Sequence, residues 1–239
     1  MPGTIGGCER ERRSDMAVER EVEVVAGDVR LGGTLAVPEG ARGLVIFAHG
    51  SGSSRHSPRN RYVAYSLRMA GLGTLLFDLL TEEEEEEDEV TAALRFDIDF
   101  LARRLGEVTD WVLGHPELGR MRVGYFGSST GAAAALVAAA ERPKTIAAVV
   151  SRGGRPDLAG GALERVVAPT LFIVGGADDV VLELNQRAME RLGGPKELEV
   201  IAGATHLFEE RGALERVAEV AAGWFTRILG VPQELETRP

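Results

Sequence analysis

The chain has 239 residues, of which 44% are hydrophobic and 27% are charged, and its formal net charge is -10. This size and composition are typical of a single globular domain, and the acidic balance argues against a nucleic-acid partner, whose phosphates require clustered Lys and Arg. No stretch reaches the roughly 18 uninterrupted apolar residues of a membrane helix, so we expect no membrane association.

The two ends of the chain differ from the rest. Residues 1–17 are polar, contain the single cysteine, Cys8, and lack the apolar run of a secretory signal. We expect residues 1–17 to be a disordered tail, residues 18–230 to form one domain, and residues 231–239 to form a C-terminal tail. One cysteine excludes an intramolecular disulfide framework and fits a reducing compartment, so the expected location is the cytoplasm.

The domain begins with two β-type segments and continues as an alternation of strands and helices. Residues 19–25 and 30–37 flank a turn at Gly27-Asp28 and predict an antiparallel hairpin. Continuous apolar runs then alternate with amphipathic ones, which is typical of buried parallel strands and their crossover helices. The expected strands are 44–48, 73–77, 122–126, 147–150, 170–174 and 197–201. The expected helices are 58–70, 92–113, 129–141, 184–192 and 213–229.

This alternation predicts an α/β fold with a mostly parallel twisted sheet, helices on both faces and an N-terminal antiparallel hairpin. The segment between the strands at 147–150 and 170–174 is too short for a large lid. In such sheets ligands bind beyond the carboxyl ends of the strands. We therefore expect the functional site at that edge.

The acidic run from Glu82 to Glu87 invites a metal-site interpretation, but consecutive carboxylates point in different directions and define no coordination geometry. Thr81 and Glu84 match a capping box, and negative charge is favourable at a helix N-terminus. The run therefore predicts a helix start, and the sequence predicts neither a metal nor another cofactor.

The pentapeptide Gly-Ser-Ser-Thr-Gly at residues 127–131 lies between a strand-like run and an alanine-rich, helix-like run. A G-x-S-x-G nucleophile elbow has this context, because the chain must reverse from strand to helix in a strained turn. Side chains at the two glycine positions would collide with neighbouring backbone. Ser129 is therefore the predicted nucleophile.

A serine hydroxyl is a good nucleophile only when an imidazole accepts its proton and an acid orients that imidazole. Of the four histidines, only His206 follows Ser129, in a loop of small residues after the last expected strand. Asp178 and Asp179 follow the preceding strand. We predict Asp178 as the acid because of its G-x-x-D spacing from Gly175, with Asp179 as the alternative. The order serine, acid, histidine is that of α/β-hydrolases.

Acyl transfer also needs N–H donors directed at the developing oxyanion. The predicted donors are the backbone N–H of Thr130, directly after the nucleophile, and that of Ser51, in the glycine-serine loop after the first parallel strand. A phosphate cradle is the competing interpretation of this loop. It is disfavoured because the loop lacks both G-x-x-x-x-G-K-[ST] and G-x-G-x-x-G.

Three further side chains are predicted to bind substrate. Arg55 and His56 continue the glycine-serine loop, and Arg152 follows another strand end. A guanidinium fork is suited to a substrate carboxylate. Loop pinning or pairing with surface acids is the alternative role for these side chains.

Two segments carry a family resemblance. The sequences G-Y-F-G-S-S-T-G-A at residues 124–132 and G-A-T-H-L-F at residues 203–208 resemble the dienelactone hydrolase-like branch of the α/β-hydrolase superfamily. The resemblance implies the α/β-hydrolase fold and places the triad acid at Asp178. Dienelactone hydrolases use a cysteine nucleophile, whereas this chain has Ser129.

Together these residues predict a cofactor-independent serine esterase that cleaves small esters through an acyl-enzyme intermediate. Lactonase, thioesterase, peptidase or acyltransferase chemistry would use the same residues. A non-catalytic ligand-binding module on the same fold is the alternative from a different class. A covalent serine probe would separate these two classes.

Overall fold

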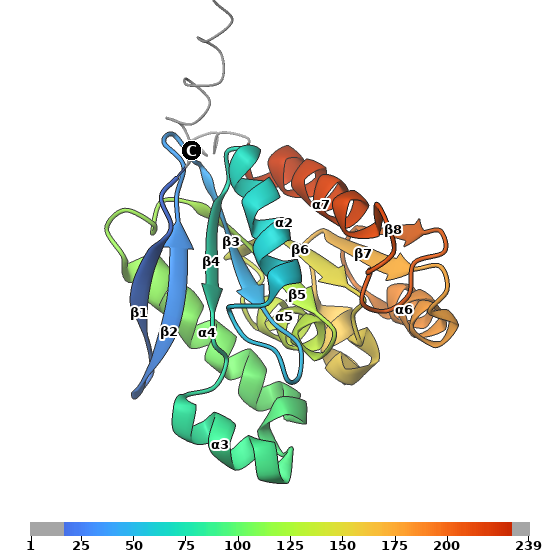
Figure 1. The fold of residues 1–239 in the computed structure, drawn as a ribbon, viewed down its shortest axis with the longest axis horizontal. Helices are drawn as coiled ribbons and strands as arrows, with labels where there is room; N and C mark the ends of the chain where they lie inside the picture. Colours follow the sequence, from blue (N-terminus) through green and yellow to red (C-terminus); the bar gives the residue numbers. More distant parts are fainter. Residues whose placement is uncertain (1–16, 231–239) are drawn as a thin grey trace, which may run out of the picture.

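The computed structural model describes residues 17–230, so all but residue 17 of the tail expected at 1–17, including Cys8, and the whole tail expected at 231–239 lie outside this range. The described chain contains an eight-stranded sheet in the order β1-β2-β4-β3-β5-β6-β7-β8 (Figure 1). The strands are β1 (Arg20–Ala26), β2 (Val29–Ala36), β3 (Gly43–Ala48), β4 (Gly73–Phe77), β5 (Arg122–Ser128), β6 (Ile146–Arg152), β7 (Thr170–Gly175) and β8 (Lys196–Ile201). Every expected strand is present, and the hairpin is confirmed.

Strands β3 to β8 pair with one another in parallel, whereas β1 pairs with β2, and β2 with β4, in antiparallel fashion. All residues of β3, β4 and β7 are buried. Strands covered on both faces are apolar throughout rather than alternating, which is why their sequences are continuous hydrophobic runs. The predicted α/β fold with a mostly parallel sheet is confirmed.

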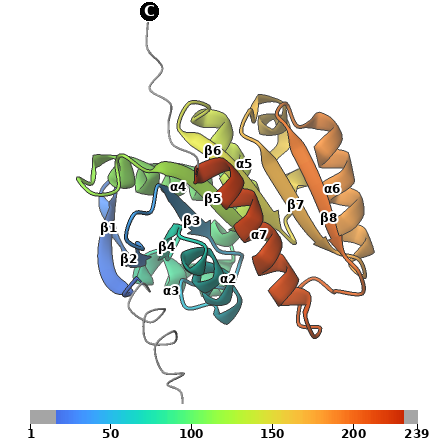
Figure 2. The same ribbon diagram turned by 90° about the horizontal axis from the view of Figure 1, so that it is seen from above.

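Helices cover both faces of the sheet. The helices are α2 (Pro58–Met69), α3 (Glu82–Thr91), α4 (Ile98–Gly114), α5 (Thr130–Glu141), α6 (Asp179–Arg191) and α7 (Ala213–Leu229), with 3-10 segments η1 (Leu94–Phe96) and η2 (Pro156–Arg165). Helices α2 and α7 pack on one face, and α4 and α5 pack on the other (Figure 2). Every residue of α5 except Glu141 is buried, and its alanines allow it to lie close to β5.

The helix expected at 92–113 is wrong at its start. Helix α3 ends at Thr91, its C-cap residue Ala92 has a left-handed φ of 53°, and α4 begins only after Asp97. The Asp97 carboxylate accepts the Phe100 N–H at 2.9 Å and so caps α4. The buried carboxylate of Asp88 accepts the N–H groups of Leu94 and Arg95 at 2.7 and 3.0 Å, which fixes the turn between the helices.

The acidic run forms the start of α3, as its capping residues predicted. The Thr81 hydroxyl accepts the Glu84 N–H at 3.2 Å, and the Glu84 carboxylate accepts the Thr81 N–H at 2.8 Å. The same carboxylate binds the Arg104 guanidinium at 2.7 and 3.0 Å, which joins α3 to α4. Two other differences concern the second half of the chain: α6 begins at Asp179 rather than at residue 184, and η2 was not predicted.

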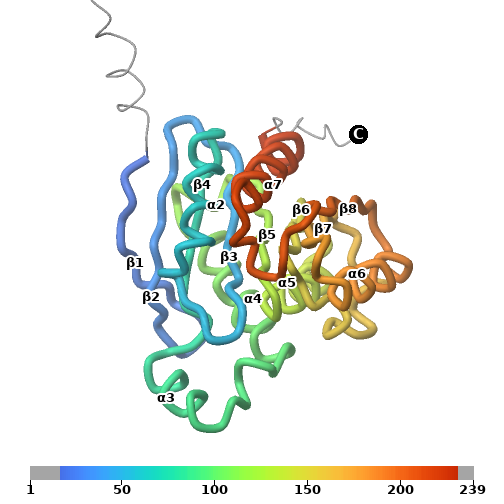
Figure 3. The backbone as a smooth tube through the Cα atoms, turned by 45° about the vertical axis from the view of Figure 1, so that its right-hand side comes forward, coloured from blue at the N-terminus to red at the C-terminus, as the bar shows by residue number. Residues whose placement is uncertain are grey.

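Both ends of the described chain lie at the edge where the parallel strands begin. Arg20 pairs with Leu35, close to the start of β4, and a side chain at Gly43 would contact Leu229 of α7 at 2.5 Å. Figure 3 shows the start of β1 and the end of α7 on the side opposite α3. Among the described helices, none is long and apolar enough to cross a membrane.

Candidate active site

Ser129 occupies a strained turn between β5 and α5. Its φ of 51° and ψ of -120° place a residue with a side chain in a sparsely populated region, at a cost of about 1–3 kcal/mol. A Cβ at Gly127 would lie 2.4 Å from Ala132 Cα, and one at Gly131 would lie 2.3 Å from the Ala48 carbonyl oxygen. Both glycines of the elbow are therefore required by close backbone approach.

The backbone of the neighbouring β6 end holds this turn in place. The Ser129 N–H donates to the Arg152 carbonyl at 3.3 Å, and the Ser129 carbonyl accepts the Arg155 N–H at 3.1 Å. The Ser129 side chain makes no capping hydrogen bond to α5. Its hydroxyl is thus not committed to the helix that follows.

Asp178 and His206 form a hydrogen-bonded pair. The distance between His206 Nδ1 and Asp178 Oδ2 is 2.8 Å. Asp178 follows β7 and is largely buried, with a side-chain exposure of 16%, whereas the exposed Asp179 begins α6. Of the two adjacent aspartates, the structure places Asp178 on the imidazole.

The loops that carry this pair are joined by backbone contacts. The Ala177 N–H donates to the Ala204 carbonyl at 2.9 Å. A Cβ at Gly175 would lie 2.3 Å from the same oxygen, so only glycine permits this approach. The loop after β7 therefore fixes the position of the loop after β8, and with it the imidazole of His206.

Ser129 and His206 line one cavity of about 220 Å³ at the carboxyl edge of the sheet. Because Nδ1 of His206 is engaged by Asp178, Nε2 is the nitrogen available to accept a proton from a nucleophile. The structure thus brings together the three side chains predicted as a triad, from loops after β5, β7 and β8.

The glycine-serine loop after β3 lies directly against the elbow. A Cβ at Gly50 would be 3.1 Å from both the Ser129 Cβ and the Ser128 carbonyl oxygen. The Ser51 N–H, a predicted oxyanion donor, donates to the Thr130 hydroxyl at 2.9 Å. Thr130 thus contributes a side-chain contact to this loop that the sequence analysis did not anticipate.

His49 connects the glycine-serine loop to the end of β4. Its Nε2 accepts the Leu79 N–H at 3.0 Å, so the proton resides on Nδ1, which lies 3.0 Å from the Gly50 carbonyl oxygen. Burial lowers the pKa of His49, which keeps the imidazole neutral. His49 has a positioning role that sequence order alone did not reveal.

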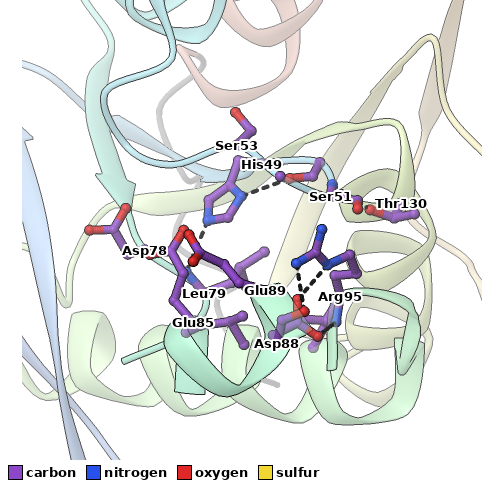
Figure 4. Close-up of a pocket in the computed structure, with 14 residues that line it drawn as sticks. His49, Ser51, Ser53, Asp78, Leu79, Glu85, Asp88, Glu89, Arg95 and Thr130 are labelled. Carbon is purple, nitrogen blue, oxygen red and sulfur yellow. Dashed lines mark hydrogen bonds and ion pairs between the residues drawn. The ribbon is translucent and has the colours of Figure 1, made fainter. Parts of the chain in front are cut away.

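A second cavity, of about 180 Å³, lies on the other side of this loop (Figure 4). Thr130 and His49 form one wall, and Glu85 and Glu89 point into it from α3. Asp88, also on α3, is paired with Arg95 at 2.5 Å. The glycine-serine loop therefore separates an acidic cavity from the cavity that contains Ser129.

The three predicted substrate-binding residues have different positions. Arg55 pairs with the carboxylate of Asp78 and lies 3.4 Å from Glu21, so its guanidinium pins the loop and does not line the Ser129 cavity. His56 is exposed and also lies outside that cavity. Arg152 does line it, together with Arg59, which the sequence analysis did not identify.

Ser129, Asp178 and His206 follow strands β5, β7 and β8 of a mostly parallel sheet. This is the chain order of nucleophile, acid and histidine in α/β-hydrolases, and the fold and this order define the class of the protein. The model of the dienelactone hydrolase family matches residues 31–229, and the chain belongs to that family. Within the described residues, no group of three or more His, Cys, Asp or Glu side chains could hold a metal ion.

Comparisons with known proteins agree with this family. A crystal structure of dienelactone hydrolase from Anabaena variabilis is 59% identical, with a TM-score of 0.88, over 90% of this chain and 99% of that one. A dienelactone hydrolase-like promiscuous phosphotriesterase from metagenomic libraries shares the fold, with 18% identity and a TM-score of 0.74 over 90% of this chain and all of that one (100%).

A Mycobacterium tuberculosis protein, provisionally named a phosphoribosyl transferase, is 61% identical over 207 residues. The match covers 87% of this chain and 46% of the relative, so the chain spans less than half of that protein's length.

Proposed function

We propose that this protein is a serine hydrolase that cleaves carboxylic esters of small substrates through an acyl-enzyme intermediate. The observation that carries the proposal is the hydrogen bond between His206 and Asp178 beside a cavity that also contains the strained Ser129. Strained backbone at a nucleophile is expected where function, rather than stability, fixes the conformation. Membership of a hydrolase family supports the same reaction class.

The first half of the reaction forms the acyl-enzyme. Ser129 Oγ attacks the ester carbonyl carbon while His206 Nε2 accepts its proton, and the imidazolium then gives that proton to the departing alkoxide. Asp178 holds Nδ1 and so orients the ring and stabilises its charged form. In the second half, His206 takes a proton from water, and the resulting hydroxide equivalent attacks the acyl carbon. The imidazolium then returns its proton to Ser129 Oγ as the bond from Oγ to the acyl carbon breaks and the carboxylic acid leaves.

Negative charge on the carbonyl oxygen requires donors close to Ser129. The Thr130 N–H, in the first turn of α5, is one such donor, and the positive end of the helix dipole adds to its effect. The second is the Ser51 N–H, which Thr130 Oγ1 holds beside the elbow at 2.9 Å. The Ser51 N–H already donates to Thr130 Oγ1. It therefore stabilises the oxyanion by donating to both oxygen atoms, or by exchanging Thr130 Oγ1 for the oxyanion.

The reaction is tested with a panel of 4-nitrophenyl esters, a lactone and a thioester, using the parent chain and Ser129→Ala. We expect turnover of short-chain esters by the parent and loss of nearly all of it in Ser129→Ala. A fluorophosphonate probe should label the parent at Ser129 only. Equal turnover in both chains, or labelling elsewhere, contradicts the mechanism. Ligand affinity without turnover or labelling would favour a binding module.

A further inference from the structure

The side-chain amide of Asn60 is fixed next to the elbow. Asn60 lies in the first turn of α2, is 3% exposed, and lines the cavity that contains Ser129 and His206. Its oxygen Oδ1 accepts the hydroxyl of Ser128, the residue directly before Ser129, at 3.1 Å. The amide is therefore tied to the residue next to the nucleophile.

The neighbouring groups determine which way this amide faces. Nη2 of Arg152 lies 3.3 Å from the Ser128 hydroxyl oxygen, and a guanidinium can only donate to that oxygen. The one hydroxyl hydrogen of Ser128 is therefore directed elsewhere, and it is donated to Oδ1 of Asn60. Oδ1 thus faces Ser128, and Nδ2 with its two hydrogens faces away from Ser128.

The nitrogen Nδ2 of Asn60 has no hydrogen-bond partner in the part of the chain that the structure describes. It is also not one of the polar atoms that are buried without a partner, so it is accessible. Because the rest of the side chain is buried, the accessible part of the amide is the part that lines the cavity. Asn60 therefore presents N–H donors to the space around Ser129.

The other asparagine of the chain, Asn185, has the reverse arrangement. Asn185, in α6, is completely buried, and its Nδ2 donates to the carbonyl oxygens of Gly154 and Val181 at 3.0 and 2.7 Å. Its donors are thus used to join elements of the fold. In Asn60 the oxygen is used inside the protein and the donors face the cavity, as expected of a polar group that binds a ligand.

One of the two oxyanion donors is already engaged, because the Ser51 N–H donates to Thr130 Oγ1 at 2.9 Å. The surroundings of Asn60 favour negative charge. No Asp or Glu side chain lines the cavity, and the first turn of α2 does, so the positive end of that helix dipole lies there. A donor at Asn60 would thus act where the protein already favours an anion.

We propose that Asn60 Nδ2 is a further oxyanion donor, which binds the ester carbonyl oxygen as negative charge develops on it. This inference rests on the proposed ester hydrolysis. When Ser129 Oγ adds to the carbonyl carbon, the π electron pair of the C=O bond moves to the oxygen, and Asn60 donates a hydrogen bond to that oxygen while keeping its proton. The electron pair returns to the C=O bond as the alkoxide leaves, and the hydrogen bond weakens.

The kinetic test removes the amide and its partner together. Asn60→Leu alone leaves the buried Ser128 hydroxyl without its acceptor, whereas the double variant Asn60→Leu/Ser128→Ala removes both polar groups. The double variant should lower kcat for 4-nitrophenyl butyrate about 10²-fold, the loss for one oxyanion donor, with little change in KM. Ser128→Ala alone keeps Nδ2 and should lose about ten-fold or less. Gln186→Leu, which removes an exposed amide on α6, is the control and should match the parent.

A binding test separates oxyanion stabilisation from a structural role of Asn60. Propyl trifluoromethyl ketone adds to a catalytic serine as a tetrahedral hemiketal with a negatively charged oxygen, whereas propyl methyl ketone has a similar shape and stays a ketone. Because the hemiketal resembles the intermediate, the double variant should bind the trifluoromethyl ketone about 10²-fold more weakly than the parent. Inhibition by propyl methyl ketone should not change. A distorted cavity would weaken both inhibitors, and that result would overturn the role as a donor.

The outcomes separate this inference from the hydrolase proposal. A parent chain that neither hydrolyses esters nor binds the trifluoromethyl ketone overturns both. An active parent whose double variant retains kcat overturns only the role of Asn60, and so does a rise in KM with kcat unchanged, because the hydrogen bond would then be made to the ground state. If the double variant does not fold, Asn60→Asp provides the comparison. It keeps Oδ1 for the Ser128 hydroxyl, replaces Nδ2 by an oxygen, and should show at least the same loss of kcat.

Discussion

Replacing Ser129 by glycine should make the protein more stable than replacing it by alanine. Ser129 has a φ of 51° and a ψ of -120°, a conformation that glycine reaches without the steric penalty of a Cβ. Ser129→Ala keeps the Cβ and therefore the strain. The side chain makes no cap hydrogen bond, so neither substitution removes a stabilising contact of that kind.

The size of the effect follows from two opposing terms. Strain of about 1–3 kcal/mol is released in Ser129→Gly. The greater freedom of glycine in the unfolded chain offsets about 0.5–1 kcal/mol of this gain relative to alanine. The glycine variant should thus be more stable than the alanine variant by about 1 kcal/mol, or about 2–4 °C in Tm for a domain of this size.

The assay is thermal unfolding of both variants, which should both be inactive. Ser66, inside helix α2, is the control position. Ser66→Gly should have a lower Tm than Ser66→Ala, because glycine is unfavourable in a helix interior. If Ser129→Gly melts at or below Ser129→Ala, the turn is not strained in the way its backbone angles indicate. The elbow conformation would then need another explanation.

Three further predictions concern the surroundings of Ser129. Thr130→Val removes the acceptor that holds the glycine-serine loop and should lower kcat about ten-fold with little change in KM, whereas Thr130→Ser should retain activity; equal rates in the two variants would contradict this role. Asp178→Asn should lower kcat by about 10⁴-fold and Asp179→Asn should leave it near the parent value; the reverse result would exchange their roles. Burial lowers the pKa of His49 in the folded chain, so as the pH falls the unfolded chain binds a proton at His49 before the folded chain does. Proton binding by the unfolded chain destabilises the fold, so the Tm should be constant above about pH 7 and fall below about pH 6.5. His49→Asn should weaken this fall between pH 7 and 5.5, and an unchanged slope would show that His49 is not its source.

The sequence predicted the elements of the site that depend on local pattern. Ser129, Asp178 and His206 each follow a strand closely, and the ends of parallel strands meet at one edge of a sheet. Backbone geometry at Gly127 and Gly131 is likewise encoded in neighbouring residues. Fold class, strand order along the chain and the site edge could therefore be predicted without long-range information.

Side-chain partners across the sheet could not be predicted in the same way. Arg55 was expected at the substrate, but it pairs with Asp78, 23 residues away, because the loop after β3 lies beside the end of β4. Arg59 was missed because it lies on a helix rather than at a strand end. The partner of Arg55 and the position of Arg59 at the cavity both depend on how elements distant in the sequence pack together.

The helix break at Asp97 was missed for a different reason. Apolar residues continue at helical spacing from Leu94 into α4, so periodicity gave no sign of an interruption. The carboxylate of Asp97 was the available local signal, because aspartate favours helix N-caps. The turn between α3 and α4 also depends on Asp88, whose buried carboxylate accepts the Leu94 N–H and pairs with the Arg95 guanidinium.

Arg20 and Leu229, near the two ends of the described chain, lie at the edge of the sheet where the parallel strands begin. Ser129 lies at the opposite edge, where these strands end. An affinity tag, a resin linkage or a fused protein joined at either of these points would be anchored facing away from the catalytic entrance. Immobilised preparations should therefore hydrolyse substrate at rates close to those of the free enzyme, whichever end is used for attachment.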